Sequence, residues 1–149
     1  MFNNVYQGKK VLLTGHTGFK GTWLTTWLIK LGANVVGVSK DIPTNPSMFE
    51  ILGLSDKIKH IVLDICKFEN VSKIIQDEKP DFVFHLAAQA IVSVSYSEPL
   101  KTISSNVIGT TNILEALRIS NHECTAIIIT RDKAYDNIEQ IWGYKENDQ

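Results

Sequence analysis

Short apolar runs alternate along the chain with longer amphipathic stretches. The apolar runs predict buried strands at residues 10–14, 34–39, 58–63, 81–86 and 125–130. Helical spacing of apolar residues predicts helices within residues 18–31, 68–75 and 100–119. Strands that are apolar throughout and alternate with helices are typical of a parallel sheet covered on both faces. We therefore predict an α/β fold, a doubly wound parallel sheet of the Rossmann type, with strand order 3-2-1-4-5 and incomplete after the fifth strand.

Composition and charge narrow the class of protein. The chain has 149 residues, which fits one domain, and its 15 Lys and Arg against 16 Asp and Glu leave a net charge of −1. With no basic excess, nucleic acid and an anionic membrane are not expected partners. Two distant cysteines, Cys66 and Cys124, predict neither a disulfide framework nor a zinc ribbon. Without an apolar leader or membrane-length segment, a cytoplasmic location is expected.

The first predicted strand runs directly into a glycine-rich loop, Gly15-His16-Thr17-Gly18-Phe19-Lys20-Gly21. In such a loop Gly15 permits a tight turn, Gly18 lets a pyrophosphate approach the backbone, and Gly21 lets the helix pack against the sheet. The helix N-terminus adds N–H groups and a positive dipole end, which favour an anion. A strand, this loop and a helix in that order predict a dinucleotide site, and a purely structural turn is the alternative.

Acidic residues follow the second and third predicted strands. Asp41 lies near the position where a carboxylate binds the ribose hydroxyls of NAD, whereas its neighbour Lys40 would favour the 2′-phosphate of NADP. Asp64 stands where it can meet an adenine amino group, and a solvated carboxylate at a strand end is the alternative. This stretch favours NAD over NADP.

Candidate chemistry also follows the fourth and fifth strands. Ala87 and Ala88 are small, so a cofactor can lie against their backbone, while His85 is interpreted as a packed core residue. The four histidines are scattered along the chain, and no metal cluster is predicted. Asp132 and Lys133 are either an acid–base pair that faces the cofactor or part of a charged surface loop.

A proline-rich insertion follows the second strand. In it, Ser47 and Glu50 have the spacing of a helix capping box, in which the serine side chain bonds the helix N-terminus.

Six motifs in this order resemble the extended short-chain dehydrogenase/reductases: GHTGFKG, PTNPSMFE, HLAAQ, NVIGT, RDKAY and WGY. The likeness covers essentially the whole chain, and Pro43 to Glu50, Asp132-Lys133 and residues 141–144 are similar to the CDP-glucose 4,6-dehydratase branch in particular. It implies NAD as cofactor and CDP-glucose as substrate. In the implied reaction hydride leaves C4, water is lost across C5 and C6, and hydride returns to C6. The product, CDP-4-keto-6-deoxyglucose, implies a role in deoxysugar and polysaccharide synthesis, and the complete enzyme is expected to be a homo-oligomer.

The same resemblance implies roles for individual residues. Asp132 protonates the leaving C6 hydroxyl and Lys133 takes the C5 proton. The cofactor contacts that it implies, with those inferred above, are Gly15, Thr17, Gly18, Phe19, Gly21, Asp41, Asp64, Ile65, Ala87, Ala88, Gln89, Asn106 and Thr130. Among these, Asn106 is expected mainly to organise the helix beside the site.

Two positions depart from the family pattern. Arg131 stands where the family has Ser or Thr, and a guanidinium group cannot accept a hydrogen bond. The family's Tyr-x-x-x-Lys pair is not found up to residue 149, since Asp148 stands four residues after Tyr144. We therefore expect residues 1–149 to be a truncated NAD-binding Rossmann domain without the sugar-nucleotide domain, inactive alone. A non-catalytic NAD-binding remnant and a nucleotide-sugar epimerase are the alternatives.

Overall fold

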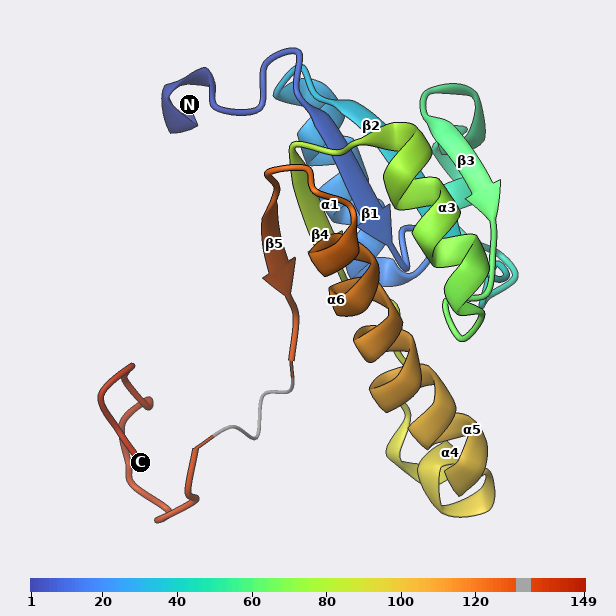
Figure 1. Ribbon diagram of the computed structural model, residues 1–149. Coiled ribbons are helices and arrows are strands. Elements are labelled where there is room, and N and C mark those ends of the chain that lie inside the picture. Colours follow the sequence, from blue (N-terminus) through green and yellow to red (C-terminus); the bar gives the residue numbers. More distant parts are fainter. Residues whose placement is uncertain (131–134) are drawn as a thin grey trace.

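The computed structural model describes residues 1–130 and 135–149. Five parallel strands form one sheet in the order β3-β2-β1-β4-β5: β1 (Lys10–Thr14), β2 (Asn34–Ser39), β3 (Lys59–Val62), β4 (Phe82–His85) and β5 (Thr125–Ile128). Their carboxyl ends therefore lie along one edge of the sheet, the lower edge in Figure 1. The predicted strand order is confirmed, and β1 and β2 have the predicted bounds.

Helices cover both faces of this sheet. Helix α1 (Phe19–Lys30) lies on one face, and α3 (Phe68–Glu78) packs beside α6 (Gly109–Ile119) on the other (Figure 1). Side chains alternate between the faces along β1, because successive residues of a strand point to opposite sides. Leu12 packs in the core under α3 and α6, whereas Val11 and Leu13 pack in the core under α1.

The long helix predicted at residues 100–119 is interrupted. Helix α5 (Pro99–Ile103) passes through a π-helical turn, η3 (Ser104–Ile108), into α6. A π turn holds more residues than an α turn, so the apolar stripe of α6 is offset from that of α5. Sequence periodicity does not detect such an offset, since the residues on both sides keep helical spacing. The remaining short helices are η1 (Phe2–Asn4), α2 (Met48–Ile51), η2 (Leu54–Asp56) and α4 (Val92–Ser97).

The predicted capping box at the start of α2 is wrong. Ser47 is the N-cap residue, but its side chain makes no capping hydrogen bond. Its hydroxyl oxygen is buried and finds no hydrogen-bond partner within the described parts of the chain. Ser47 and Phe49 are both buried, so this segment is positioned by packing and not by a side-chain cap.

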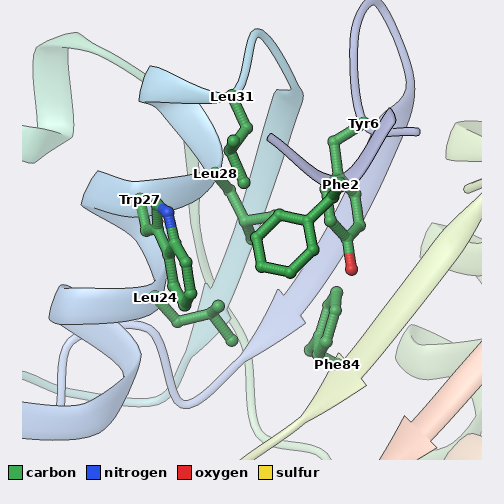
Figure 2. Close-up of a pocket in the computed structure, with 7 residues that line it drawn as sticks. All are labelled: Phe2, Tyr6, Leu24, Trp27, Leu28, Leu31 and Phe84. Atoms are coloured by element: carbon green, nitrogen blue, oxygen red, sulfur yellow. The ribbon is translucent and has the colours of Figure 1, made fainter. Parts of the chain in front are cut away.

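The N-terminal segment lies across the α1 face of the sheet. Tyr6 packs on Phe82 and Phe84 of β4, with ring centroids 5.1 and 6.3 Å apart, and Phe2 meets Trp27 edge-on at 5.4 Å. Figure 2 shows a small apolar pocket of about 140 Å³ on this face. Its wall is formed by the rings of Phe2, Tyr6, Trp27 and Phe84, by Leu24 and Leu28 of α1, and by Leu31 directly after that helix. Among the described residues, no helix has the length and apolar character needed to cross a membrane.

Candidate functional site

The glycine loop at the end of β1 is shaped by close contacts between backbones. Gly15 has φ +75°, and an added Cβ would lie 2.8 Å from the Ala87 nitrogen at the end of β4. A Cβ on Gly21 would meet the Gly15 carbonyl oxygen and lie 2.7 Å from the His16 Cα. The backbone nearest to Gly21 is therefore that of the loop directly after β1, and a residue without a side chain lets α1 begin close to the end of that strand.

Gly18 differs from both, because the fold leaves room beside it. It is the N-cap residue of α1 with φ −73°, and the nearest protein atom to an added Cβ is 3.4 Å away, an ordinary contact. The fold alone therefore does not demand glycine here. A bare backbone at the N-terminus of a 12-residue helix fits the close approach of a pyrophosphate.

Hydrogen bonds tie the glycine loop to the end of β2. The Thr17 hydroxyl donates to the backbone carbonyl of Asp41 at 2.8 Å, and the Ser39 hydroxyl oxygen lies 3.5 Å from the Thr17 nitrogen. These bonds hold Asp41 beside the loop while its side chain stays exposed. Thr17 and Asp41, both predicted site residues, are thus brought together, and the Thr17 hydroxyl acts on the backbone.

The end of β3 supplies one half-buried group, Asp64, and one buried group, Ile65. The Asp64 carboxylate accepts a hydrogen bond from the Cys66 N–H at 2.9 Å, and this bond is the main cause that lowers the pKa of Asp64. The side chain of Ile65 is buried and fills the space left by Gly109 of α6. Asp64 is therefore an ionised acceptor near this edge of the sheet, whereas Ile65 belongs to the core.

The turn after β4 is held by the π-helical turn η3. Asn106 accepts a hydrogen bond from the Gln89 N–H at 2.7 Å and donates to the Gln89 carbonyl at 2.9 Å. The Gln89 side chain also donates to the hydroxyl oxygen of Thr102 at 3.1 Å. The expectation that Asn106 organises this region is therefore in keeping with its contacts, since it fixes the backbone that follows Ala87 and Ala88.

Two histidines that are distant in sequence meet under the glycine loop. His16 Nε2 lies 2.7 Å from His60 Nδ1 of β3, and His16 Nδ1 lies 3.0 Å from the Ser39 hydroxyl. The His16 ring occupies the space left by Gly37 of β2, and Phe49 packs edge-on against it. Burial is the main cause that lowers the pKa of His16 to about 4. The prediction that the histidines are scattered is wrong for this pair. The sequence feature that could have indicated the contact is the large side chain of His16 inside a glycine-rich loop.

His85 of β4 is buried, as predicted, and its ring also makes two hydrogen bonds. Both of its ring nitrogens have partners: Thr14 Oγ1 at 2.7 Å and Thr110 Oγ1 at 3.0 Å. Burial lowers the pKa of His85 to about 4, so the ring is neutral near pH 7. The described residues contain no group of three or more potential metal ligands.

The other predicted residues lie at the rim or outside the described chain. Phe19 is exposed in the first turn of α1, and Thr130 is exposed two residues after the end of β5. The proposed acid–base pair, Asp132 and Lys133, and the neighbouring Arg131 lie outside the described residues. What the described edge of the sheet brings together is a set of loops suited to a dinucleotide.

Comparison with known proteins places the chain among nucleotide-sugar enzymes. Residues 12–148 match the family described as GDP-mannose 4,6 dehydratase. The chain is 48% identical over 145 residues to a CDP-glucose 4,6-dehydratase of Salmonella typhimurium, covering 97% of this chain and 40% of that protein. It is 32% identical to a CDP-paratose 2-epimerase of Salmonella typhi, covering 93% of this chain and 40% of that one. The chain thus spans about two fifths of the length of these relatives.

Solved structures show the same fold. An epimerase, Mth375, of Methanothermobacter thermautotrophicus superimposes with a TM-score of 0.80 and 28% identity, over 97% of this chain and 42% of that one. A UDP-glucose 4-epimerase of Thermus thermophilus, solved in complex with NAD, gives a TM-score of 0.65 and 29% identity, over 73% and 33% of the two chains.

Proposed function

The chain belongs to the family described as GDP-mannose 4,6 dehydratase, and from this membership we propose that residues 1–149 are the cofactor-binding domain of an NAD-dependent CDP-glucose 4,6-dehydratase. The observation that carries the proposal is Gly18. The loop has a glycine at a helix N-terminus where the fold leaves space for a side chain, and a ligand that approaches the bare backbone accounts for the missing side chain. The 48% identity to a CDP-glucose 4,6-dehydratase supports the substrate.

In this proposal each loop takes one part of the cofactor. The N–H groups at the start of α1 bind the pyrophosphate beside Gly15 and Gly18. The Asp41 carboxylate accepts hydrogen bonds from the adenine ribose, and the ionised Asp64 accepts one from the adenine amino group. The turn at Ala87 to Gln89 receives the nicotinamide side.

The proposed chemistry is elimination of water from a tethered sugar. When bound, NAD supplies a reversible hydride acceptor. Asp132 donates a proton to the leaving hydroxyl at C6 and Lys133 removes the proton at C5, because elimination needs one acid and one base. The product, CDP-4-keto-6-deoxyglucose, is a precursor for deoxysugar and polysaccharide synthesis. The complete enzyme is a cytoplasmic homo-oligomer in this proposal.

Titration calorimetry of the 149-residue chain tests the cofactor part. We expect saturable heat with NAD and a weaker response to NADP, since the exposed Asp41 carboxylate repels a 2′-phosphate. The Gly18→Ala variant is the matched comparison, because it changes the site and leaves the fold its space. Absence of heat with both cofactors would remove the cofactor-binding proposal.

A chimera tests the reaction. Residues 1–149 replace the equivalent part of the Salmonella typhimurium CDP-glucose 4,6-dehydratase, and mass spectrometry follows the loss of water from CDP-glucose. We expect product from the chimera, and little or none from Asp132→Asn and Lys133→Met variants that still bind NAD. A chimera that binds NAD and interconverts sugar epimers without losing water would favour the epimerase alternative. NAD binding without any turnover would favour a non-catalytic module.

A further inference from the structure

The backbone turn after β4, residues 86–89, is held by side chains from other elements. The Thr14 hydroxyl oxygen, at the end of β1, accepts a hydrogen bond from the Ala87 N–H at 3.1 Å. The Leu86 N–H is shared between this oxygen at 3.2 Å and the Thr14 backbone carbonyl at 3.1 Å. At the other end of the turn, Asn106 of η3 pairs with both backbone groups of Gln89. One end of the turn is therefore held by β1 and the other by η3.

His85 connects these two anchors, and the hydrogen bonds determine its protonation. Thr14 Oγ1 already accepts the Ala87 N–H and a share of the Leu86 N–H, so its own hydrogen points to His85 Nδ1. Thr110 Oγ1 donates its hydrogen to the Asn106 carbonyl at 2.8 Å and so accepts from His85 Nε2. Only a neutral ring with its hydrogen on Nε2 satisfies both threonines.

We infer that His85 is a positioning residue of the proposed cofactor site: its neutral Nε2–H tautomer joins Thr14 to the Asn106 turn and thereby fixes the backbone of residues 86–89. The inference rests on the proposed function, which places the nicotinamide side of the cofactor at this turn. His85 itself is 2% exposed. It acts through Thr14 and Thr110, and each of these bonds a backbone group on a different side of the site.

The tautomer can be measured without a cofactor. In the chain labelled with ¹⁵N-histidine, the NMR signals of His85 at about pH 7 are expected to report a hydrogen on Nε2 and a bare Nδ1. A hydrogen on Nδ1, or a charged ring, contradicts the inferred chain of bonds. In the Thr110→Val variant we expect the pure Nε2–H signature to be lost, because the bond that fixes the tautomer is gone.

The chain offers a matched control on the next residue of α6. Thr110 and Thr111 both donate to a helix carbonyl four residues earlier, Asn106 and Val107, but only Thr110 also meets His85. We expect Thr110→Val to weaken NAD binding about tenfold, because a buried ring nitrogen loses its partner. Thr111→Val is expected to stay within about twofold of the wild type, since its only lost bond is local.

The outcomes separate the inference from the proposed function. A wild-type chain that does not bind NAD overturns the proposed function. A wild-type chain that binds NAD, with equal affinities for Thr110→Val and Thr111→Val, overturns the inference alone. Should Thr110→Val fail to fold, His85→Gln keeps a polar group near the Nε2 position, and hydrogen exchange at the amides of residues 86–89 gives the second measurement. Faster exchange there than in the wild type supports the inference, and unchanged protection overturns it.

Discussion

At the scale of single residues, the glycine loop separates the needs of the fold from those of a ligand. Gly21 has no room for a methyl group, because the Gly15 carbonyl and the His16 Cα occupy it. Gly18 has that room, and its φ of −73° is open to any residue. The two positions look alike in the sequence, yet packing of the protein backbone requires glycine only at position 21.

Two alanine substitutions make this difference measurable. Gly21→Ala is expected to lower the free energy of unfolding by about 1–3 kcal/mol, because backbone atoms must move to admit the methyl group. Gly18→Ala is expected to lower it by less than about 1 kcal/mol, the size of an N-cap change, and to weaken NAD binding strongly. Urea denaturation and NAD titration of both variants check these results. Equal loss of stability in the two variants would show that a methyl group at position 18 also meets the backbone of the folded protein.

The two buried histidines show what residue patterns alone miss. His85 within an apolar strand predicts burial, and burial is observed, but its two threonine partners come from β1 and α6 and are 71 and 25 residues away. His16 and His60 are 44 residues apart and meet because β2 lies between them with a glycine at the crossing point. Such pairs depend on strand register, which a single sequence does not contain.

At the scale of elements, helix α3 is tied to the amino ends of two strands by one carboxylate. Glu78 is 8% exposed and pairs with Lys10 of β1 at 3.2 Å and with Lys59 of β3. The bond from Lys59 is the main cause that lowers the pKa of Glu78. This end of the sheet is opposite the proposed site, so the contact serves stability.

Glu78→Gln is expected to lower the free energy of unfolding by about 1–2 kcal/mol at pH 7, because two lysines lose a nearly buried partner. Its pKa is lowered in the fold, so the contribution is complete above the unfolded value and vanishes as the pH falls through the lowered one. Denaturation at several pH values checks both statements. Glu115→Gln breaks an exposed pair with Arg118 and serves as the control, with no measurable change expected.

The N-terminal segment is a second element with a testable role. Tyr6 covers Phe82 and Phe84 on the α1 face of the sheet, beside the pocket of Figure 2. Tyr6→Ala is expected to lower the free energy of unfolding by about 2–4 kcal/mol, since burial and aromatic contacts are both lost. Tyr96→Ala, at a position 84% exposed, is expected to change it little. Similar effects from the two would mean that the segment does not pack on the sheet.

Most elements were predictable because each has a local cause. The apolar runs of β1 and β2 locate both strands to the residue, and the glycine loop marks the start of α1. The π-helical turn was not predictable from helical spacing, and the contacts that accompany it are tertiary: Asn106 in the turn bonds Gln89, and Thr110 just after it bonds His85. The same π-helical turn supplies Asn106 to the proposed site. The sequence therefore predicted an uninterrupted helix and missed the threonine partners of His85 for the same reason, since both depend on tertiary contacts.

At the scale of the whole molecule, the predicted site residues come from four strand ends that the sheet order brings to one edge. Gly15, Asp41, Asp64 and Ala87 follow β1, β2, β3 and β4, and β1 lies between β2 and β4 in the sheet. This gathering was predictable, because the carboxyl ends of parallel strands share an edge. The inward contacts of Ile65 and the histidines were not, since they depend on how the layers pack on that sheet.

Those buried histidines also connect the site to the stability of the entire fold. His16 and His85 have pKa values lowered from 6.5 to about 4. Between these values the unfolded chain binds protons that the folded chain does not, so stability falls as the pH drops below 6.5. From about pH 7.5 to about pH 5 each histidine is expected to remove about 2 kcal/mol from the free energy of unfolding.

Urea denaturation at these two pH values measures the loss, and His85→Gln identifies its source. The variant lacks one of the two titrating rings, so it is expected to lose about half as much stability as the wild type over the same interval. The carboxylates do not obscure the result, because Asp64, Glu78 and Asp81 have lowered pKa values and stay ionised at pH 5. A wild-type stability that is flat over the interval would mean that these rings are charged in the folded chain. In that case the hydrogen-bond chain through His85 could not exist, because a charged ring has no acceptor for the Thr14 hydroxyl.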